Sequence, residues 1–181
     1  MSTSWRGRKE PTAGELLFVN WVLVLLRGIP VAIVVFGGLI IHTALRIFEH
    51  PFLGSRRPLT QYVTQVVCKT SLFLLGISIR VEGFPMKERG AVVANHSSWL
   101  DIFALNATQK IYFVAKSEVA NWPGIGWLAR ATGTVFIQRK ALQAHKQKNI
   151  FTERLLAGHK LLFFPEGTST DSLRVLPFKS S

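Results

Sequence analysis

A long apolar run dominates the first third of the chain. Residues 16–41 read LLFVNWVLVLLRGIPVAIVVFGGLII, and Arg27 is the only formally charged residue in that run. About 20 apolar residues cross a bilayer as a helix, so the length fits one crossing. The residue before a proline avoids helical backbone, and Pro30 therefore predicts a break at Ile29. Such a break would divide the segment into halves, roughly 16–26 and 31–48, that are each too short to cross.

The basic residues around this run bear on its orientation. Basic residues precede it and also follow it: Arg6, Arg8 and Lys9, then Arg46, Arg56 and Arg57. Because positive charge marks the cytoplasmic side, we favour a hairpin in one leaflet with both ends cytoplasmic, and keep a single crossing as the alternative. Either geometry makes residues 1–58 a membrane anchor. The run is too long for a cleaved signal peptide, contains an arginine and lacks a small-residue cleavage site.

Residues 59–79 form a second, weaker apolar stretch in which polar residues recur. The pattern predicts an amphipathic helix that lies against the membrane or the protein core. Cys68 falls within it, and we interpret that residue as a small buried hydrophobe and not as a nucleophile.

After Gly76 the chain changes to short runs of strand-forming residues. These runs are Ile77–Val81, Ala91–Ala94, Ile111–Ala115, Val135–Ile137, Leu161–Phe164 and Val175–Pro177. Helical stretches lie between several of them: one begins at Pro123 and ends before Gly133, and another covers Ala141–Ala157. Strands that alternate with helices predict an α/β domain over residues 59–181, with a largely parallel sheet and covering helices. The last strand has no following cover, so we expect this domain to be incomplete at its C-terminus.

Composition narrows the class of partner. Lys and Arg number 22 against 10 Asp and Glu, a net charge of +12, and 48% of the residues are hydrophobic. That apolar content excludes a disordered basic tail, and a single cysteine excludes a disulfide framework or a thiolate zinc cluster. A membrane with anionic lipids, or an acyl donor carrying phosphates, satisfies both the charge and the hydrophobicity. We expect no nucleic-acid partner, because the sequence shows no recognition helix and no aromatic RNA-binding strand.

Candidate chemistry begins with the block Asn95-His-Ser-Ser-Trp-Leu-Asp101, directly after the predicted strand AVVA. Open α/β folds bind ligands where strands end. His96 can act as a base near neutral pH, and the Asp101 carboxylate can hold its ring in the useful tautomer. The alternative interpretation is a helix cap with His96 simply exposed.

Two later blocks also place polar residues after strands. Arg139 ends the block GTVFIQR, and the forked guanidinium suits a phosphate or a carboxylate. Glu166, Gly167 and Thr168 follow the strand that ends in Phe-Phe-Pro, where a glycine allows a ligand to approach the backbone. Taken separately, the block that ends in Arg139 is also typical of solvated charges, and the block Glu166–Thr168 is also typical of an ordinary turn.

The chain resembles the glycerolipid acyltransferase family, which includes bacterial 1-acylglycerol-3-phosphate acyltransferases. The resemblance rests on four blocks that occur in this order: H-x4-D, G-x-x-F-I-x-R, F-P-E-G-T and V-x-P. The four blocks lie at residues 96–101, 133–139, 164–168 and 175–178. The resemblance implies acyl transfer from a thioester, acyl-CoA or acyl carrier protein, to the hydroxyl of a lysolipid. His96 would be the general base and Asp101 would orient it. The acceptor head group would be held by a set of polar residues: Arg139, Glu166, Gly167, Thr168 and, as a further basic candidate, Lys116.

No metal and no cofactor beyond the acyl donor is expected. The resemblance places the protein in the inner membrane with its site facing the cytoplasm. It implies 1-acylglycerol-3-phosphate as the acceptor and phosphatidic acid as the product. Ser169 stands where members using that acceptor commonly have arginine, and the segment 166–179 also looks like relatives that acylate a lyso-ornithine lipid. That acceptor, and a non-catalytic membrane adaptor, are the alternatives.

Overall fold

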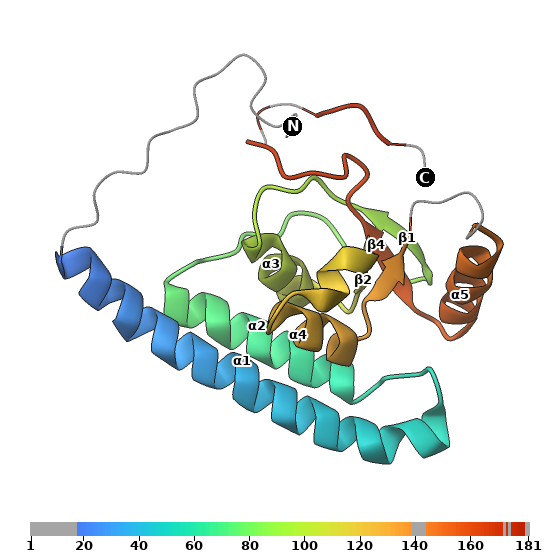
Figure 1. The fold of residues 1–181 in the computed structure, drawn as a ribbon, viewed down its shortest axis with the longest axis horizontal. Helices are drawn as coiled ribbons and strands as arrows, with labels where there is room; N and C mark the ends of the chain where they lie inside the picture. Colours follow the sequence, from blue (N-terminus) through green and yellow to red (C-terminus); the bar gives the residue numbers. More distant parts are fainter. Residues whose placement is uncertain (1–17, 139–143, 172, 174, 180–181) are drawn as a thin grey trace.

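The computed structural model describes residues 18–138, 144–171, 173 and 175–179. The described part contains a four-stranded sheet in the order β1-β4-β2-β3, in which every pair is parallel. Its strands are β1 (Gly90–Val93), β2 (Tyr112–Lys116), β3 (Val135–Ile137) and β4 (Lys160–Phe163). The helices are α1 (Phe18–Leu53), α2 (Thr60–Leu75), α3 (Leu100–Thr108), α4 (Ile125–Thr132) and α5 (Ala144–Leu156), with a 3-10 turn, η1, at Ser117–Asn121 (Figure 1). The predicted α/β class with a largely parallel sheet is confirmed.

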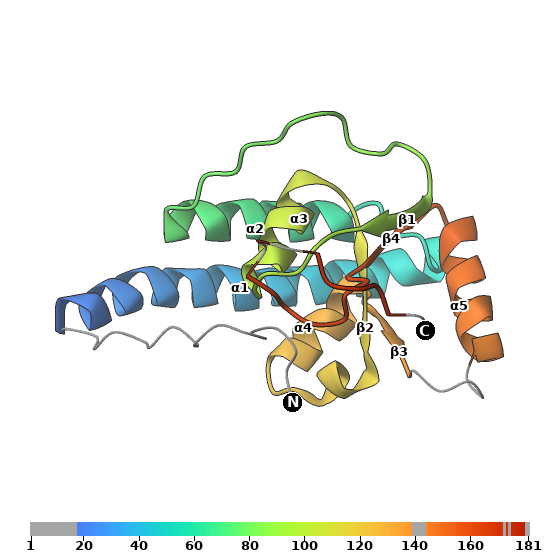
Figure 2. The ribbon, with the colours of Figure 1, turned by 90° about the horizontal axis from the view of Figure 1, so that it is seen from above.

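The central strands β2 and β4 are largely buried on both faces of the sheet, which explains why they read as apolar runs, whereas alternate residues of the edge strand β1 are exposed. On one face, Tyr112, Val114 and Leu161 pack with the α5 residues Ile150 and Phe151. On the other face, Phe113 and Leu162 pack with Leu105 of α3. Figures 1 and 2 show the same arrangement, with α5 on one side of the strands and α3 on the other. Because the strands are parallel, all their carboxyl ends meet at one edge.

Helix α1 runs without interruption from Phe18 to Leu53, so the predicted break at Ile29, and a hairpin within residues 16–48, are wrong. Pro30 removes one helical hydrogen bond, but the local preference is overridden by packing against α2. Arg27 donates from Nη1 to the carbonyl oxygen of Leu75 at 3.0 Å, at the end of α2. Arg27 can therefore lie inside an apolar run because it binds the C-terminus of α2, and a helix C-terminus favours a cation.

Close contact between α1 and α2 depends on a glycine. A Cβ atom added to Gly38 would lie 2.3 Å from the Cγ2 atom of Val67, far inside van der Waals contact. The two helices run antiparallel beside one another along the lower side of the molecule in Figure 1. Within the described residues, α1 is the one helix that length and composition make able to span a membrane; an 18-residue window within Asn20–Leu53 has a mean hydropathy of 2.4.

Two of the predicted strands are not formed. Ile77–Val81 is an exposed connection with no strand partner, and Val175–Pro177 is irregular. In the second case the backbone N–H of Leu176 is donated to a side chain, and Pro177 has no N–H to give. The other predicted elements form with ends shifted by a few residues; α4, for example, begins at Ile125 and not at Pro123.

Candidate active site

His96 and Asp101 meet at the carboxyl end of β1. The Nδ1 atom of His96 lies 2.7 Å from the Oδ2 atom of Asp101, and the two side chains are 26% and 23% exposed. β1 ends at Val93, a short turn follows, and α3 begins at Leu100. The imidazole is therefore fixed on one side by a carboxylate and still open to a substrate on the other.

The same carboxylate oxygen also accepts hydrogen bonds from two backbone N–H groups. Ser97 donates at 2.7 Å and Ser98 at 3.0 Å to Oδ2 of Asp101, while the N–H of Leu100 is donated to the hydroxyl of Ser98 at 3.2 Å. His96 is therefore not simply exposed, as the helix-cap interpretation would have it, because Asp101 binds it as well as the two N–H groups that precede α3. These backbone donors hold the carboxylate in place.

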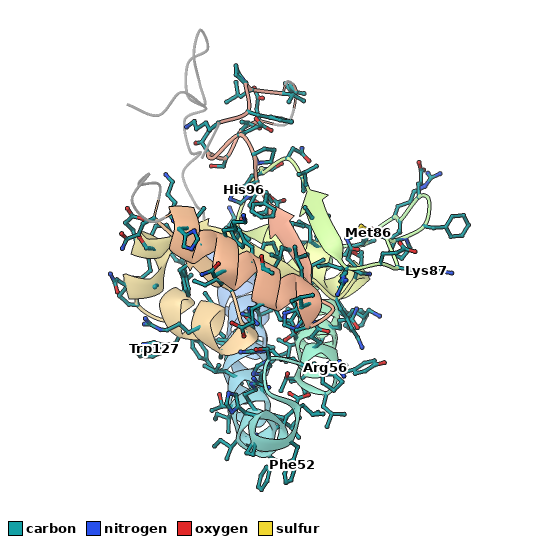
Figure 3. The ribbon with its side chains drawn as sticks, turned by 90° about the vertical axis from the view of Figure 1, so that its right-hand side faces the viewer. Phe52, Arg56, Met86, Lys87, His96 and Trp127 are labelled. Carbon is teal, nitrogen blue, oxygen red and sulfur yellow. The ribbon has the colours of Figure 1, made fainter. Side chains whose placement is uncertain are left out.

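Two contacts from the segment after β4 complete the surroundings of His96. Its ring stacks on Phe164, with centroids 4.2 Å apart and planes at 21°. The backbone N–H of Thr170 is donated to the carbonyl oxygen of His96 at 2.7 Å. Figure 3 shows His96 on the upper side of the strands, next to this segment. The imidazole can thus turn little about its side-chain bonds.

This geometry defines what the histidine can do. An ionised carboxylate only accepts hydrogen bonds, so Nδ1 carries the proton and Nε2 keeps its lone pair. A base whose other nitrogen is held in this way can take a proton from a hydroxyl and remain stabilised as the cation. The arrangement supports general-base catalysis on a hydroxyl-bearing acceptor.

The turn Glu166–Thr168 is arranged differently from the expectation. The side chain of Glu166 is buried, with 1% of the residue exposed, and its Oε2 atom accepts the N–H of Leu176 at 3.1 Å. Gly167 has a φ of +66° and donates its N–H to Phe164 at 3.0 Å, so it forms the turn itself. Thr168 is partly exposed. Glu166 therefore ties the turn after β4 to Leu176, while the backbone at Thr170 borders His96.

Of the two basic candidates, the structure describes Lys116. Lys116 is the last residue of β2, is exposed, and stands in register with Ile137 at the end of β3. It lies at the same edge of the sheet as His96. Arg139 lies outside the described residues.

Some parts of the site could not be identified from spacing. Phe164 reads as an ordinary strand residue, and its stacking on His96 depends on β1 and β4 being neighbours. The Thr170 contact has no residue-type signal, because a backbone group makes it. Cys68 is buried as predicted, and burial raises the pKa of its thiol to about 12. A thiol with that pKa is not a nucleophile at neutral pH.

Comparison with known proteins places this geometry in a family. The family model described as Acyltransferase matches residues 78–181. Among solved structures, the 1-acyl-sn-glycerophosphate acyltransferase from Thermotoga maritima superposes with a TM-score of 0.62, at 26% identity over 89% of this chain and 66% of that one.

Curated relatives carry two kinds of name. A lyso-ornithine lipid O-acyltransferase from Rhodobacter capsulatus is 51% identical over 98% of this chain, and one from Pseudomonas aeruginosa is 40% identical over 65%. A 1-acyl-sn-glycerol-3-phosphate acyltransferase from Neisseria gonorrhoeae is 39% identical over 62% of this chain. The chain spans 64% of the length of the first relative and 46% of each of the other two.

Proposed function

Because the chain belongs to the acyltransferase family, we propose that it transfers a fatty acyl group from a thioester to the hydroxyl of a lysolipid. The observation that carries this proposal is the 2.7 Å contact between His96 Nδ1 and Asp101 Oδ2 at the carboxyl edge of the sheet. A matching family model supports the reaction class. Retention of the pair argues against a non-catalytic adaptor.

The proposed reaction needs one base and no covalent enzyme intermediate. Nε2 of His96 removes the proton from the acceptor hydroxyl as its oxygen attacks the thioester carbonyl carbon. The carbon–sulfur bond breaks when the tetrahedral intermediate collapses, and the proton passes from His96 to the departing thiolate. Asp101 stabilises the imidazolium in between. The donor is acyl-CoA or acyl carrier protein, and no further cofactor takes part in the proposal.

We propose a lyso-ornithine lipid as the acceptor and keep 1-acylglycerol-3-phosphate as the second candidate. This reverses the preference that followed from the family resemblance of the sequence. The relative that is 51% identical over 98% of this chain is named for lyso-ornithine lipid, whereas two Neisseria relatives named for the glycerol phosphate are 39% and 42% identical over 62% and 50% of it. Ser169 supports this order, because it is exposed and precedes Thr170, whose N–H binds His96. A serine there supplies no charge for a phosphate. Lys116, Thr168 and Arg139 remain the proposed head-group residues.

The proposal places the enzyme in the inner membrane with the site on the cytoplasmic side, where CoA and carrier-protein thioesters are found. Residues 1–58 would act as the anchor. The exposed apolar surface of α1 supports membrane association, and acyl chains would then reach the site laterally from the lipid.

The reaction class is tested with purified protein, an acyl-thioester donor and each lysolipid in turn. Wild type is expected to acylate the lyso-ornithine lipid, and His96→Ala is expected to lower turnover by roughly 10²–10⁴-fold. His145→Ala, which removes an exposed imidazole from α5, is the matched control. Normal turnover in the His96 variant would refute the mechanism.

The acceptor assignment is tested by Ser169→Arg. An added cation beside the site is expected to raise the ratio of lysophosphatidate to lyso-ornithine acylation about tenfold, since a charge-assisted contact contributes about 1.5–3 kcal/mol. An unchanged ratio would show that residue 169 does not contact the head group.

A further inference from the structure

A second group of cationic and polar side chains lies at the opposite edge of the sheet from His96. Tyr112 is the first residue of β2, and His159 directly precedes β4, whereas His96 follows the end of β1. Because these strands are parallel, Tyr112 and His159 mark the amino-terminal edge. Figure 3 shows His96 and Arg56 on opposite sides of the strands.

A cleft of about 520 Å³ opens at this edge between the last turns of α1 and the end of α4. Three arginines line it: Arg46, Arg57 and Arg130. Apolar residues of α1 form another part of the wall, including Ile47 and Pro51. Among the described residues that line the cleft there is no carboxylate, so its charge is strongly positive.

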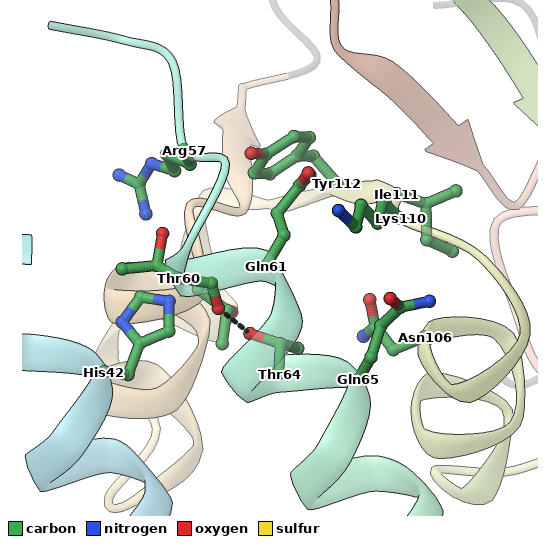
Figure 4. A pocket seen from close by; sticks show the side chains of 11 residues that line it. His42, Arg57, Thr60, Gln61, Thr64, Gln65, Asn106, Lys110, Ile111 and Tyr112 are labelled. Atoms are coloured by element: carbon green, nitrogen blue, oxygen red, sulfur yellow. Dashed lines mark hydrogen bonds between the residues drawn. The ribbon is translucent and has the colours of Figure 1, made fainter. Parts of the chain in front are cut away.

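The adjacent interior contains polar atoms without partners. A cavity of about 10 Å³ shares His42 and Arg57 with the cleft, and Figure 4 shows these two side chains near each other at its rim. His42 is 4% exposed, and its Nδ1 atom has no hydrogen-bond partner within the described structure; the same holds for Arg57 Nε and the Tyr112 hydroxyl. Buried polar atoms are ordinarily paired, so this wall is suited to a polar ligand.

The electrostatics of the site also favour an anion. Burial, together with the nearby guanidinium groups of Arg46 and Arg154, lowers the pKa of Arg57 to about 10. Arg57 therefore stays charged at neutral pH in a place where positive charges repel each other. Glu49, 3.7 Å from Arg46, offsets one of these positive charges, so three arginines against one carboxylate leave the surroundings of the cleft net positive.

We propose that this cleft binds the phosphate group of an anionic membrane phospholipid. Arg130 and the unpartnered Nε of Arg57 offer donors to a phosphate, and Arg46, whose two terminal nitrogens bind backbone carbonyls, adds positive charge. A basic pocket beside a membrane helix is suited to lipid head groups. The wall of α1 supplies the lipid-facing side, since Ile47 is 66% exposed and the neighbouring Phe48 is 72% exposed. Inorganic phosphate has the same charge chemistry but cannot use that apolar wall.

Arg130 is the best residue for a test. Arg57 donates to the carbonyl of Ala131 at 2.7 Å, and Arg46 donates to the carbonyl of Arg56 at 3.1 Å, so both also hold the fold. Arg130 is exposed in the last turn of α4, so we expect its loss to leave the packing intact. Arg80 is a matched control, because it is an exposed arginine on the distant 77–86 connection.

The experiment titrates the full chain, purified in zwitterionic detergent, with short-chain phosphatidylglycerol and follows binding by calorimetry. Saturable binding is expected for wild type. Arg130→Gln is expected to bind about tenfold more weakly, because it loses one charge-assisted contact, and Arg80→Gln is expected to bind as wild type does. Thermal unfolding midpoints of both variants should equal that of wild type.

Equal weakening in the two variants would overturn the proposal, because it would reflect only the net charge of the protein. Inorganic phosphate is expected to bind far more weakly than the lipid. Should it bind as tightly and with the same dependence on Arg130, the site would belong to free phosphate and the lipid assignment would be wrong. Binding is measured without any acyl donor, so this result does not depend on the proposed acyl transfer.

Discussion

At the scale of single residues, one oxygen atom organises the candidate active site. Oδ2 of Asp101 accepts hydrogen bonds from His96 Nδ1 and from the backbone N–H groups of Ser97 and Ser98, all within 3.0 Å. Three donors around one oxygen fix the carboxylate before any substrate binds. The imidazole is thus set in one tautomer and one orientation, which is the preorganisation that proton transfer requires.

We predict that Asp101→Asn lowers turnover by about 10²-fold or more while costing only about 1 kcal/mol of stability. The amide oxygen can still accept a backbone N–H, but it carries no charge to stabilise the imidazolium of His96. Steady-state acyl transfer and thermal unfolding measure the two effects. Glu118→Gln, an exposed carboxylate-to-amide change, should alter neither. Wild-type turnover in Asp101→Asn would show that the 2.7 Å contact has no part in catalysis.

A second residue-scale prediction concerns acid stability. Burial, and then the nearby Arg154 and Arg57, lower the pKa of His159 from 6.5 to about 4. The unfolded chain therefore binds the proton more readily, so this histidine's contribution is complete above pH 6.5 and is lost as the pH falls to about 4. His159→Phe keeps a ring against Tyr112, 4.1 Å away, and should reduce the fall in unfolding midpoint over that range.

The control for this measurement is His145→Phe, which changes an exposed histidine on α5. Its midpoint should follow that of wild type from pH 7 to pH 4. If His159→Phe and wild type lose the same stability over this range, His159 does not contribute to the acid sensitivity.

At the scale of elements, the association of α1 with α2 depends on two features of α1. Arg27 binds the end of α2 through Leu75, and Gly38 allows the helices to approach at Val67. Both lie in a segment that reads as a plain apolar run. α1 stays continuous through Pro30, in the region where α2 packs along it.

We predict opposite effects of alanine at two adjacent glycines. Gly37 has nothing within 4 Å of a new Cβ, so Gly37→Ala should stabilise the helix by about 0.5–1 kcal/mol. Gly38→Ala should destabilise the protein by about 1–3 kcal/mol, because Val67 is stiff in a helix and cannot easily turn away. Thermal unfolding in detergent measures both changes. Adding Val67→Ala to Gly38→Ala should restore part of the loss, and an equal effect of the two alanines would contradict this packing.

The predicted and the observed strands differ in a way that has a physical reason. Four predicted strands formed with ends within one residue, because each is a short apolar run between turn residues and each pairs with a neighbouring strand. Ile77–Val81 has similar residues but no neighbouring strand, and Leu176 gives its N–H to Glu166. Strand propensity alone could not distinguish these cases, since pairing partners decide them. The His96–Asp101 pair was predictable from its position after a strand, whereas the Phe164 stack required the strand order.

At the scale of the whole molecule, the position of α1 limits how the protein can meet a membrane. α2 packs along α1 from Arg27, which binds Leu75, to Glu49, which binds Thr60. The part of α1 before Arg27 that lies free of α2 is therefore residues 18–26, about 14 Å of helix at 1.5 Å per residue. A bilayer core is about 30 Å thick, so this free part is too short to cross while α2 and the sheet remain on one side.

We therefore predict that α1 lies within one leaflet and that both of its ends face the cytoplasm. Single cysteines introduced at Arg8 and at Arg56 should both resist an impermeant thiol reagent added outside intact cells. Both should react once the membrane is permeabilised. The native Cys68 gives little background, because it is buried and its pKa is raised to about 12. Labelling of the Arg8→Cys protein but not of the Arg56→Cys protein from outside would show that α1 crosses the membrane. In that case α2 would have to separate from α1 in the bilayer, and the Arg27 contact with Leu75 could not survive there.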